Sequence, residues 1–124
     1  MRKEMLEVRC ELYHAAKHWE LLIAVARGLA RKAPGNSQGW IMWAFALREQ
    51  QKVAEARDVL LEAEPHHPKC GNLHYNLSCY YCLLGDQEEA KRRLRKACKL
   101  EKQWKAAALD DPDLKGMWDQ IASL

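Results

Sequence analysis

An internal repeat of 34 residues runs through this chain of 124 residues. Pro34 and Pro68 lie one interval apart, and each follows a run of Ala, Leu and charged residues. The same shift aligns Tyr13, Leu47 and Tyr81, with a small residue three positions before each. Further apolar columns follow at spacings of four and three residues: Leu22, Ala56 and Ala90; Ala26, Leu60 and Leu94; Leu29, Ala63 and Ala97. Such spacing marks one stripe on an α-helix, so each repeat predicts amphipathic helices.

Each repeat is predicted to hold two helices, which bury their apolar faces by stacking on neighbouring repeats. Ala, Leu, Glu, Lys, Arg and Gln are abundant and β-branched residues are few, which favours helices without a sheet. Ser37 is the expected N-cap of the third helix, and Gly85 with Asp86 predicts a tight turn. The stretch 65–68 contains two prolines and predicts an early end to the fourth helix, with a longer linker after it. The expected helices span residues 3–15, 18–32, 37–50, 53–64, 71–84 and 87–101.

The repeat pattern resembles that of tetratricopeptide-repeat proteins. The second repeat carries it best, through Trp40, Trp43, Ala44, Leu47, Ala56, Ala63 and Pro68. The third repeat has His74, Leu77, Ser78, Tyr81, Ala90 and Ala97, with Lys102 in place of the closing proline. The first departs most, through Arg9, Leu22 and Leu29.

The resemblance implies one all-α domain over residues 1–124, a right-handed superhelix of three helix-turn-helix repeats with a C-terminal capping helix. The repeats are expected at about 3–36, 37–70 and 71–102, and the cap at about 103–124. In that cap, Trp104, Ala107, Ala108 and Leu109 are expected to cover the last repeat, and a second stripe contains Leu114, Met117, Trp118 and Ile121.

The resemblance also implies a concave groove lined by the first helix of each repeat. By position, the groove residues include Glu4, Glu7, Glu11, His14, Gln38, Ile41, Phe45, Arg48, Asn72, Tyr75, Cys79 and Cys82. The first repeat is acidic there and the later repeats are more apolar, which fits a peptide or protein segment with a basic end and an apolar anchor. Two alternatives remain, in which the chain's own termini or a second subunit cover this surface.

Some relatives bind the carboxylate tails of chaperones with Lys, Arg and Asn at defined groove positions. This chain has Glu7, Glu11, Met42, Asn72 and Asn76 at the matching positions. Carboxylates repel a carboxylate ligand, so we do not expect this chain to bind such tails. A self-associating structural protein, or a chaperone specific for one partner, stays open as an alternative use of the same surface.

Metal and cofactor sites are not predicted. His66, His67, Cys70, His74, Cys79 and Cys82 include pairs that share a helix face, but their spacing matches no closed zinc template. The five cysteines, an odd number, favour free thiols in a reducing compartment rather than a disulfide framework.

Nucleic-acid, enzymatic and membrane functions are also not predicted. The net charge is only +3, and the basic run at residues 91–102 has acidic partners in Glu88 and Glu89 and no interleaved aromatic residues. No phosphate-binding loop, nucleophile elbow or helix-borne pair of histidines with a glutamate occurs. The charged N-terminus, without a long apolar stretch, favours a cytoplasmic protein.

Overall fold

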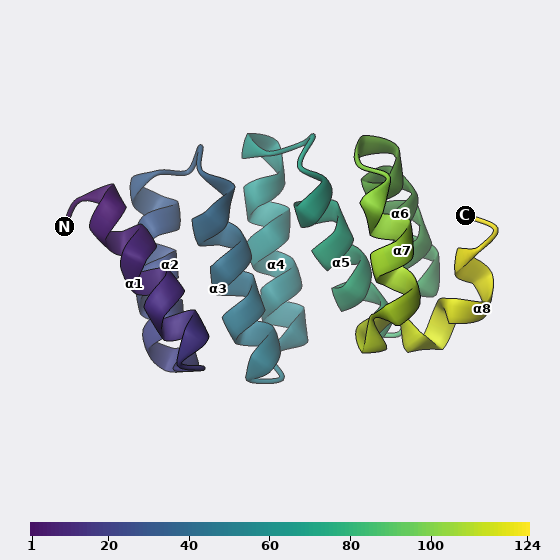
Figure 1. Cartoon of the computed structure of the whole chain (residues 1–124), viewed down its shortest axis with the longest axis horizontal. Coiled ribbons are helices and arrows are strands. Elements are labelled where there is room, and N and C mark those ends of the chain that lie inside the picture. Colours follow the sequence, from purple (N-terminus) through teal and green to yellow (C-terminus); the bar gives the residue numbers. More distant parts are fainter. The chain divides into compact units, whose positions relative to one another are not determined.

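The computed structural model describes all 124 residues, and all of its regular structure is helical (Figure 1). The α-helices are α1 (Lys3–Ala15), α2 (Trp19–Lys32), α3 (Ser37–Glu49), α4 (Val53–Ala63), α5 (Gly71–Leu83), α6 (Gln87–Leu100), α7 (Gln103–Asp110) and α8 (Trp118–Ile121). Two 3-10 helices complete the fold, η1 (Glu64–His66) and η2 (Pro112–Met117). The six repeat helices and the all-α fold class are confirmed, each helix within about one residue of its predicted start and end. No helix is both long enough and apolar enough to span a membrane.

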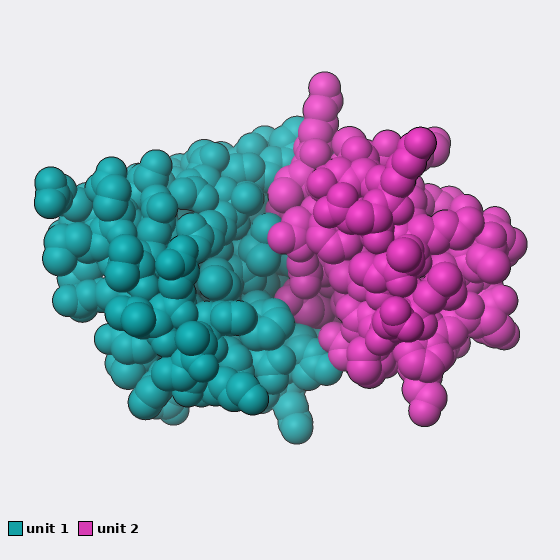
Figure 2. Space-filling model, viewed as in Figure 1, with its two compact units in different colours: residues 1–68 teal, residues 69–124 magenta.

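The chain divides into two compact units, unit 1 (Met1–Pro68) and unit 2 (Lys69–Leu124) (Figure 2). Unit 1 contains the first two helix pairs, in which α2 packs on both α1 and α3. Unit 2 contains the third helix pair, α5 with α6, together with the C-terminal segment.

The turn inside each repeat has the same backbone conformation. Lys17, Gln51 and Gly85 lie 34 residues apart and all have a positive φ, of 57°, 65° and 89°. The next residue donates its backbone N–H to a carbonyl five positions earlier: His18 to Tyr13, Lys52 to Leu47 and Asp86 to Tyr81, each at 2.9 Å. Only Gly85 adopts this left-handed conformation without a steric cost, so the first two turns carry strain that the third does not.

The N-cap of the third helix is Asn36, one residue before the predicted Ser37. The side-chain oxygen of Asn36, and not that of Ser37, accepts the backbone N–H of Gln38 at 2.9 Å. Both residue types are good N-caps and the two residues are adjacent, so the conformation of the loop decides which of them caps the helix. The expected break after the fourth helix is confirmed, because α4 ends at Ala63 and η1 occupies the linker.

The core of unit 1 consists of the small and large residues of the repeat columns. Leu22, Ala26, Leu29, Ala44, Leu47, Ala56, Leu60 and Ala63 are all buried. Helices α2 and α3 approach so closely at Gly39 that a Cβ atom there would lie 2.7 Å from the backbone nitrogen of Ala30. The indole N–H of Trp40 donates to the Pro34 carbonyl at 3.1 Å and holds the loop between these helices.

In unit 2 the C-terminal segment folds back against the helix pair. The predicted stripe is confirmed, because Leu114, Met117 and Ile121 are fully buried. The Trp118 indole N–H donates to the carbonyls of Ala108 and Asp111, at 3.0 and 3.1 Å, and ties α8 to the end of α7. Of the residues expected to cover the last repeat from α7, only Ala108 is fully buried, and Ala107 and Leu109 stay exposed because α7 packs through a single side.

Candidate functional site

The predicted groove residues of unit 1 lie on two helices that contact each other, α1 and α3. We call this set the unit 1 wall: Glu4, Glu7, Glu11 and His14 on α1, and Gln38, Ile41, Phe45 and Arg48 on α3. Glu4 and Glu11 are exposed, and the other six are partly exposed. An acidic strip on α1 therefore lies beside a more apolar strip on α3.

Glu7 joins the two helices through polar contacts. Its carboxylate accepts from the Asn36 side-chain amide at 3.4 Å and lies 3.8 Å from the Lys3 ammonium. Because Asn36 is the N-cap of α3, the Glu7 side chain is oriented by the start of that helix. Glu4 and Glu11 are the more accessible charges of the wall.

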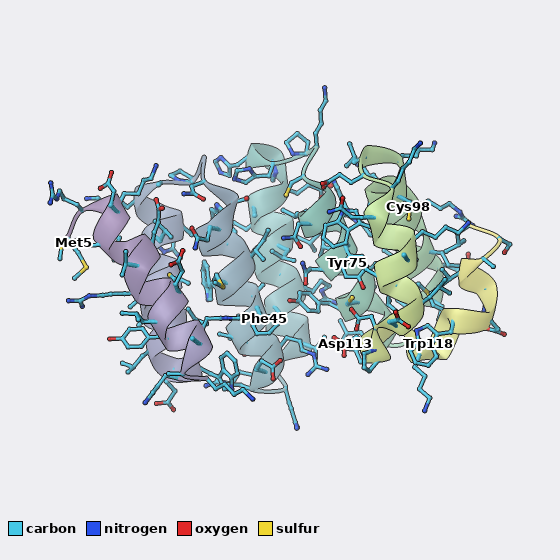
Figure 3. The ribbon with its side chains drawn as sticks, viewed as in Figure 1. Met5, Phe45, Tyr75, Cys98, Asp113 and Trp118 are labelled. Carbon is cyan, nitrogen blue, oxygen red and sulfur yellow. The ribbon has the colours of Figure 1, made fainter.

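Three aromatic rings pack against one another at one end of the unit 1 wall. His14 lies 5.1 Å from Phe45 and 6.2 Å from Trp19, and Trp19 lies 5.8 Å from Phe45, measured between ring centroids. Figure 3 shows Phe45 on α3. Trp19 was not among the predicted groove residues, because it begins the second helix of its repeat and the resemblance assigns only the first helices to the groove.

In unit 2 the chain itself covers the predicted groove face. Tyr75 is 7% exposed and Cys79 is 3% exposed. The Tyr75 ring stacks on Trp104 of α7 at 4.6 Å, and its hydroxyl donates to Asp111 Oδ2 at 2.7 Å. The open wall expected at these two positions is therefore replaced by contacts with the C-terminal segment, which was one of the alternatives left open by the sequence.

The other two predicted groove residues of unit 2 keep part of their exposure. Asn72 accepts two hydrogen bonds from the Asn76 amide, at its backbone oxygen (2.8 Å) and at Oδ1 (2.7 Å). Cys82 lies beside η2, where a Cβ on Gly116 would be 3.8 Å from its sulfur. Of the two, Cys82 therefore lies at the margin of the surface that the C-terminal segment covers.

Two carboxylates of the C-terminal segment, those of Asp111 and Asp113, lie close to the Cys79 thiol. The Cys79 Sγ lies 3.6 Å from Asp111 Oδ2, and Asp113 contributes a second carboxylate nearby (Figure 3). Burial, followed by the charges of Asp111 and Asp113, raises the pKa of Cys79 well above its usual value. Burial and the charge of Asp113 also raise the pKa of Cys82.

The Tyr75 hydroxyl belongs to the same polar group. Burial and the hydrogen bond to Asp111 raise the pKa of Tyr75 far above its usual value. The pattern analysis missed Asp111 and Asp113 because they lie outside the repeat, and the run of acidic residues around Pro112 was their only signal.

The histidines weighed as metal ligands have other partners. His66 stacks on Trp40, with ring centroids 5.9 Å apart, and a His67 ring nitrogen lies 2.8 Å from the Pro34 carbonyl. His74 is fully buried, with its Nδ1 3.1 Å from a guanidinium nitrogen of Arg93.

The basic run on α6 is anchored by acidic residues of the same helix. Glu89 pairs with Arg92 and with Arg93, and the hydrogen bond and charge of Arg92 lower the pKa of the Glu89 carboxyl. Arg93 is 4% exposed, so one member of the run points into unit 2 rather than toward a ligand. Its guanidinium forms part of the core of that unit.

Comparison with known proteins gives no match to a family model and none to a curated protein sequence. Solved structures do match. The TPR2B domain of yeast Sti1, in a complex with pHsp70, has a TM-score of 0.78 at 13% identity over 98% of this chain and 96% of that chain. TTC0263, a thermophilic TPR protein of Thermus thermophilus, has a TM-score of 0.74 at 19% identity over 100% and 83% of the two chains.

MamA from MSR-1 matches with a TM-score of 0.71 at 22% identity, over 82% of this chain and 59% of that chain. This chain therefore spans somewhat more than half the length of that MamA. The identities are low, but the agreement in fold covers nearly the whole chain for two structures whose descriptions name them as TPR proteins. The chain has the tetratricopeptide-repeat fold.

Proposed function

We propose that the chain is a non-catalytic interaction module, and that the unit 1 wall binds a peptide or protein segment. The observation that carries this proposal is the pairing of exposed carboxylates on α1, Glu4 and Glu11, with the partly exposed apolar residues Ile41 and Phe45 on α3. A segment with Lys or Arg near one end and an apolar anchor would complement both strips.

The comparison with Sti1 supports peptide binding as a use of this fold, since that structure is described as a complex with pHsp70. It does not carry over that ligand. Glu7 and Glu11 stand in this chain where tail-binding relatives have cationic or amide side chains, and their charges would repel a ligand carboxylate. The ligand of the unit 1 wall is therefore basic at the end that meets α1.

A selection from a displayed library of random peptides tests the proposal. We expect the purified chain to enrich peptides with Lys or Arg near one end and an aromatic or aliphatic anchor. The variant Glu11→Lys with Phe45→Ala should lose this enrichment, and higher salt should weaken binding because the contact is partly ionic.

Glu62→Lys is the matched control, because Glu62 is an exposed residue of α4 outside the unit 1 wall. It makes the same change of charge and should leave the selected peptides unchanged. Equal loss in Glu62→Lys and in the wall variant would contradict the assignment, as would a set of enriched peptides without basic residues.

A second candidate function, self-association, is favoured by an exposed apolar strip on α1 that lies beside Glu4. Met5, Val8 and Leu12 are 46%, 54% and 62% exposed. Met5 and Leu12 occupy the same repeat positions as Gly39 and Ala46, which are buried in unit 1. The strip thus has the position and composition of a surface that packs on another helix.

The solution mass of the chain distinguishes the two functions. An oligomer at micromolar concentration that becomes a monomer in Leu12→Asp would support self-association through α1. A wild-type monomer would leave peptide binding by the unit 1 wall as the function of the surface. Leu109→Asp, at an exposed leucine of α7, is the matched control.

A further inference from the structure

We propose that Cys79, Asp111 and Asp113 form a binding site in unit 2 for a divalent cation of the zinc class. The site is independent of the peptide-binding function proposed for unit 1. It joins one helix of the last repeat to the C-terminal segment, two parts of the chain that the repeat pattern does not relate.

The distances between the donor atoms match those around a single ion. One ligand atom from each of Cys79, Asp111 and Asp113 lies within 4.8 Å of the others. Zinc binds sulfur at about 2.3 Å and carboxylate oxygen at about 2.1 Å, so a tetrahedral site places these two atoms about 3.5 Å apart. The observed separation of Cys79 Sγ and Asp111 Oδ2 is 3.6 Å. A cation therefore fits these two ligands with little movement of either.

Cys82 lies near this group but does not belong to it, because its sulfur is not among the ligand atoms that lie within 4.8 Å of one another. It lies three residues after Cys79 on α5, so both thiols belong to one face of the helix. Its sulfur lies close to Gly116 of η2, and the charge of Asp113 contributes to raising its pKa. Cys79, Asp111 and Asp113 would give three protein ligands, and water would take the fourth tetrahedral position.

The surrounding hydrogen bonds orient the carboxylate of Asp111. Its Oδ1 accepts the backbone N–H of Asp113 at 3.0 Å, because Asp111 caps η2. Its Oδ2 accepts from the Tyr75 hydroxyl at 2.7 Å and faces Cys79. A partner of this kind holds a ligand in place and commonly strengthens metal binding.

The charge balance also favours a cation. Asp111 accepts only from neutral donors, namely a phenol, a thiol and a backbone N–H, and forms no salt bridge with Lys or Arg. A bound cation would place a positive charge beside the Asp111 carboxylate, and the Cys79 thiol would release its proton to water on binding it. The sulfur donors favour zinc over magnesium or calcium, which prefer sites made of oxygen ligands alone.

Titration of the full, untagged, chelator-treated chain with Co²⁺ tests the proposal, because cobalt replaces zinc and absorbs light when bound to thiolates. We expect sulfur-to-cobalt charge-transfer absorption that saturates near one Co²⁺ per chain and disappears when Zn²⁺ is added. Binding at His66 and His67 would not produce this absorption, since it requires a thiolate ligand.

Variants assign the site. Cys79→Ser and Asp113→Asn should each weaken Co²⁺ binding by at least about tenfold, since loss even of an outer partner commonly costs that much. Cys98→Ser and Cys70→Ser are the matched controls, because both residues are partly buried thiols outside the cluster. Asp113→Asn keeps the Asp111 cap of η2, so it tests the ligand role even where Cys79→Ser impairs folding.

The proposal is overturned by absence of the charge-transfer absorption at millimolar Co²⁺, or by absorption that Cys98→Ser removes and Cys79→Ser does not. It is also overturned if folded Asp113→Asn binds Co²⁺ as tightly as the wild type. Zinc should raise the melting temperature of the wild type and not that of Asp113→Asn, because a ligand that binds only the folded state stabilises it.

Discussion

Helices α3 and α5 occupy the same place in successive repeats, yet their predicted groove faces differ in exposure. Ile41 and Phe45 of α3 align with Tyr75 and Cys79 of α5 at the 34-residue interval. The first two are partly exposed and the second two are buried. The difference arises because the C-terminal segment packs on α5 through Trp104 and Asp111, whereas no such segment covers the α3 face within unit 1. A repeat position therefore predicts which face a residue lies on, and its neighbours decide whether that face is available.

The largest expected effect comes from loosening the segment that covers α5. Leu114 is fully buried, and Leu114→Ala should lower the free energy of unfolding by about 3 kcal/mol through lost burial and a cavity. It should also speed alkylation of Cys79, which the segment shields. Urea unfolding and mass-spectrometric mapping of alkylated thiols measure both effects.

Leu109→Ala is the control for this variant, because Leu109 is 44% exposed in the adjacent α7. It should change the free energy of unfolding by less than about 0.5 kcal/mol. Unchanged protection of Cys79 in destabilised Leu114→Ala would show that η2 does not shield this face.

A buried thiol in unit 1 gives the next effect, a loss of stability at alkaline pH. Burial, followed by the charges of Glu7 and Glu11, raises the pKa of Cys10 from 9.0 to about 11. A pKa raised by folding adds stability below the unfolded value, and this stability is lost as pH rises from about 9 to 11. The loss attributable to Cys10 should be about 2 kcal/mol.

Comparison of the wild type with Cys10→Ala over this pH range isolates the effect from the other thiols. The free energy of unfolding of Cys10→Ala should fall less steeply, and the curves should converge as the pH rises. Parallel curves would show that Cys10 does not titrate between these values. Cys70→Ala, in unit 2, controls for removal of a thiol as such.

Alanine substitutions at the glycines of α2 and α3 should have a smaller effect on the free energy of unfolding. They test how closely these two helices pack. A Cβ at position 39 would lie 2.7 Å from the backbone nitrogen of Ala30, so Gly39→Ala should destabilise the chain by about 1 to 2 kcal/mol. A Cβ on Gly28, inside α2, would meet nothing within 4 Å. Gly28→Ala should therefore stabilise by about 0.5 to 1 kcal/mol through helix propensity. Thermal unfolding of both variants checks the difference in sign.

The smallest effect on the free energy of unfolding is expected from substitutions in the turns inside the repeats, whose backbone conformation is the same in both units. Gln51→Gly should stabilise the chain by up to about 1 kcal/mol, because glycine relieves the left-handed strain at φ 65°. Gly85→Ala in unit 2 introduces that strain at φ 89° and should destabilise by about 1 kcal/mol or more. Thermal unfolding measures both, and a destabilising Gln51→Gly would show that the strain is offset elsewhere.

Most of the fold was predictable from the sequence, because packing in a repeat is local. Tyr13, Leu47 and Tyr81 recur at one interval, and a helix pair needs only its neighbours to bury such a stripe. The N-cap of the third helix was predicted wrongly, as Ser37 instead of Asn36, because the two adjacent residues are chemically similar caps and the loop geometry decides between them.

The sequence alone determined the repeat and the helices, because these follow from periodicities of a few residues. The acidic and apolar strips of the unit 1 wall were predicted from the resemblance to tetratricopeptide repeats. Only the tertiary structure decided that Tyr75 and Cys79 are covered and that Asp111 and Asp113 lie beside them. These partners come from a segment outside the repeat, more than 30 residues along the chain. The repeat periodicity does not predict these contacts. They depend on the path of the chain after α6 and on which buried side chains that path brings together.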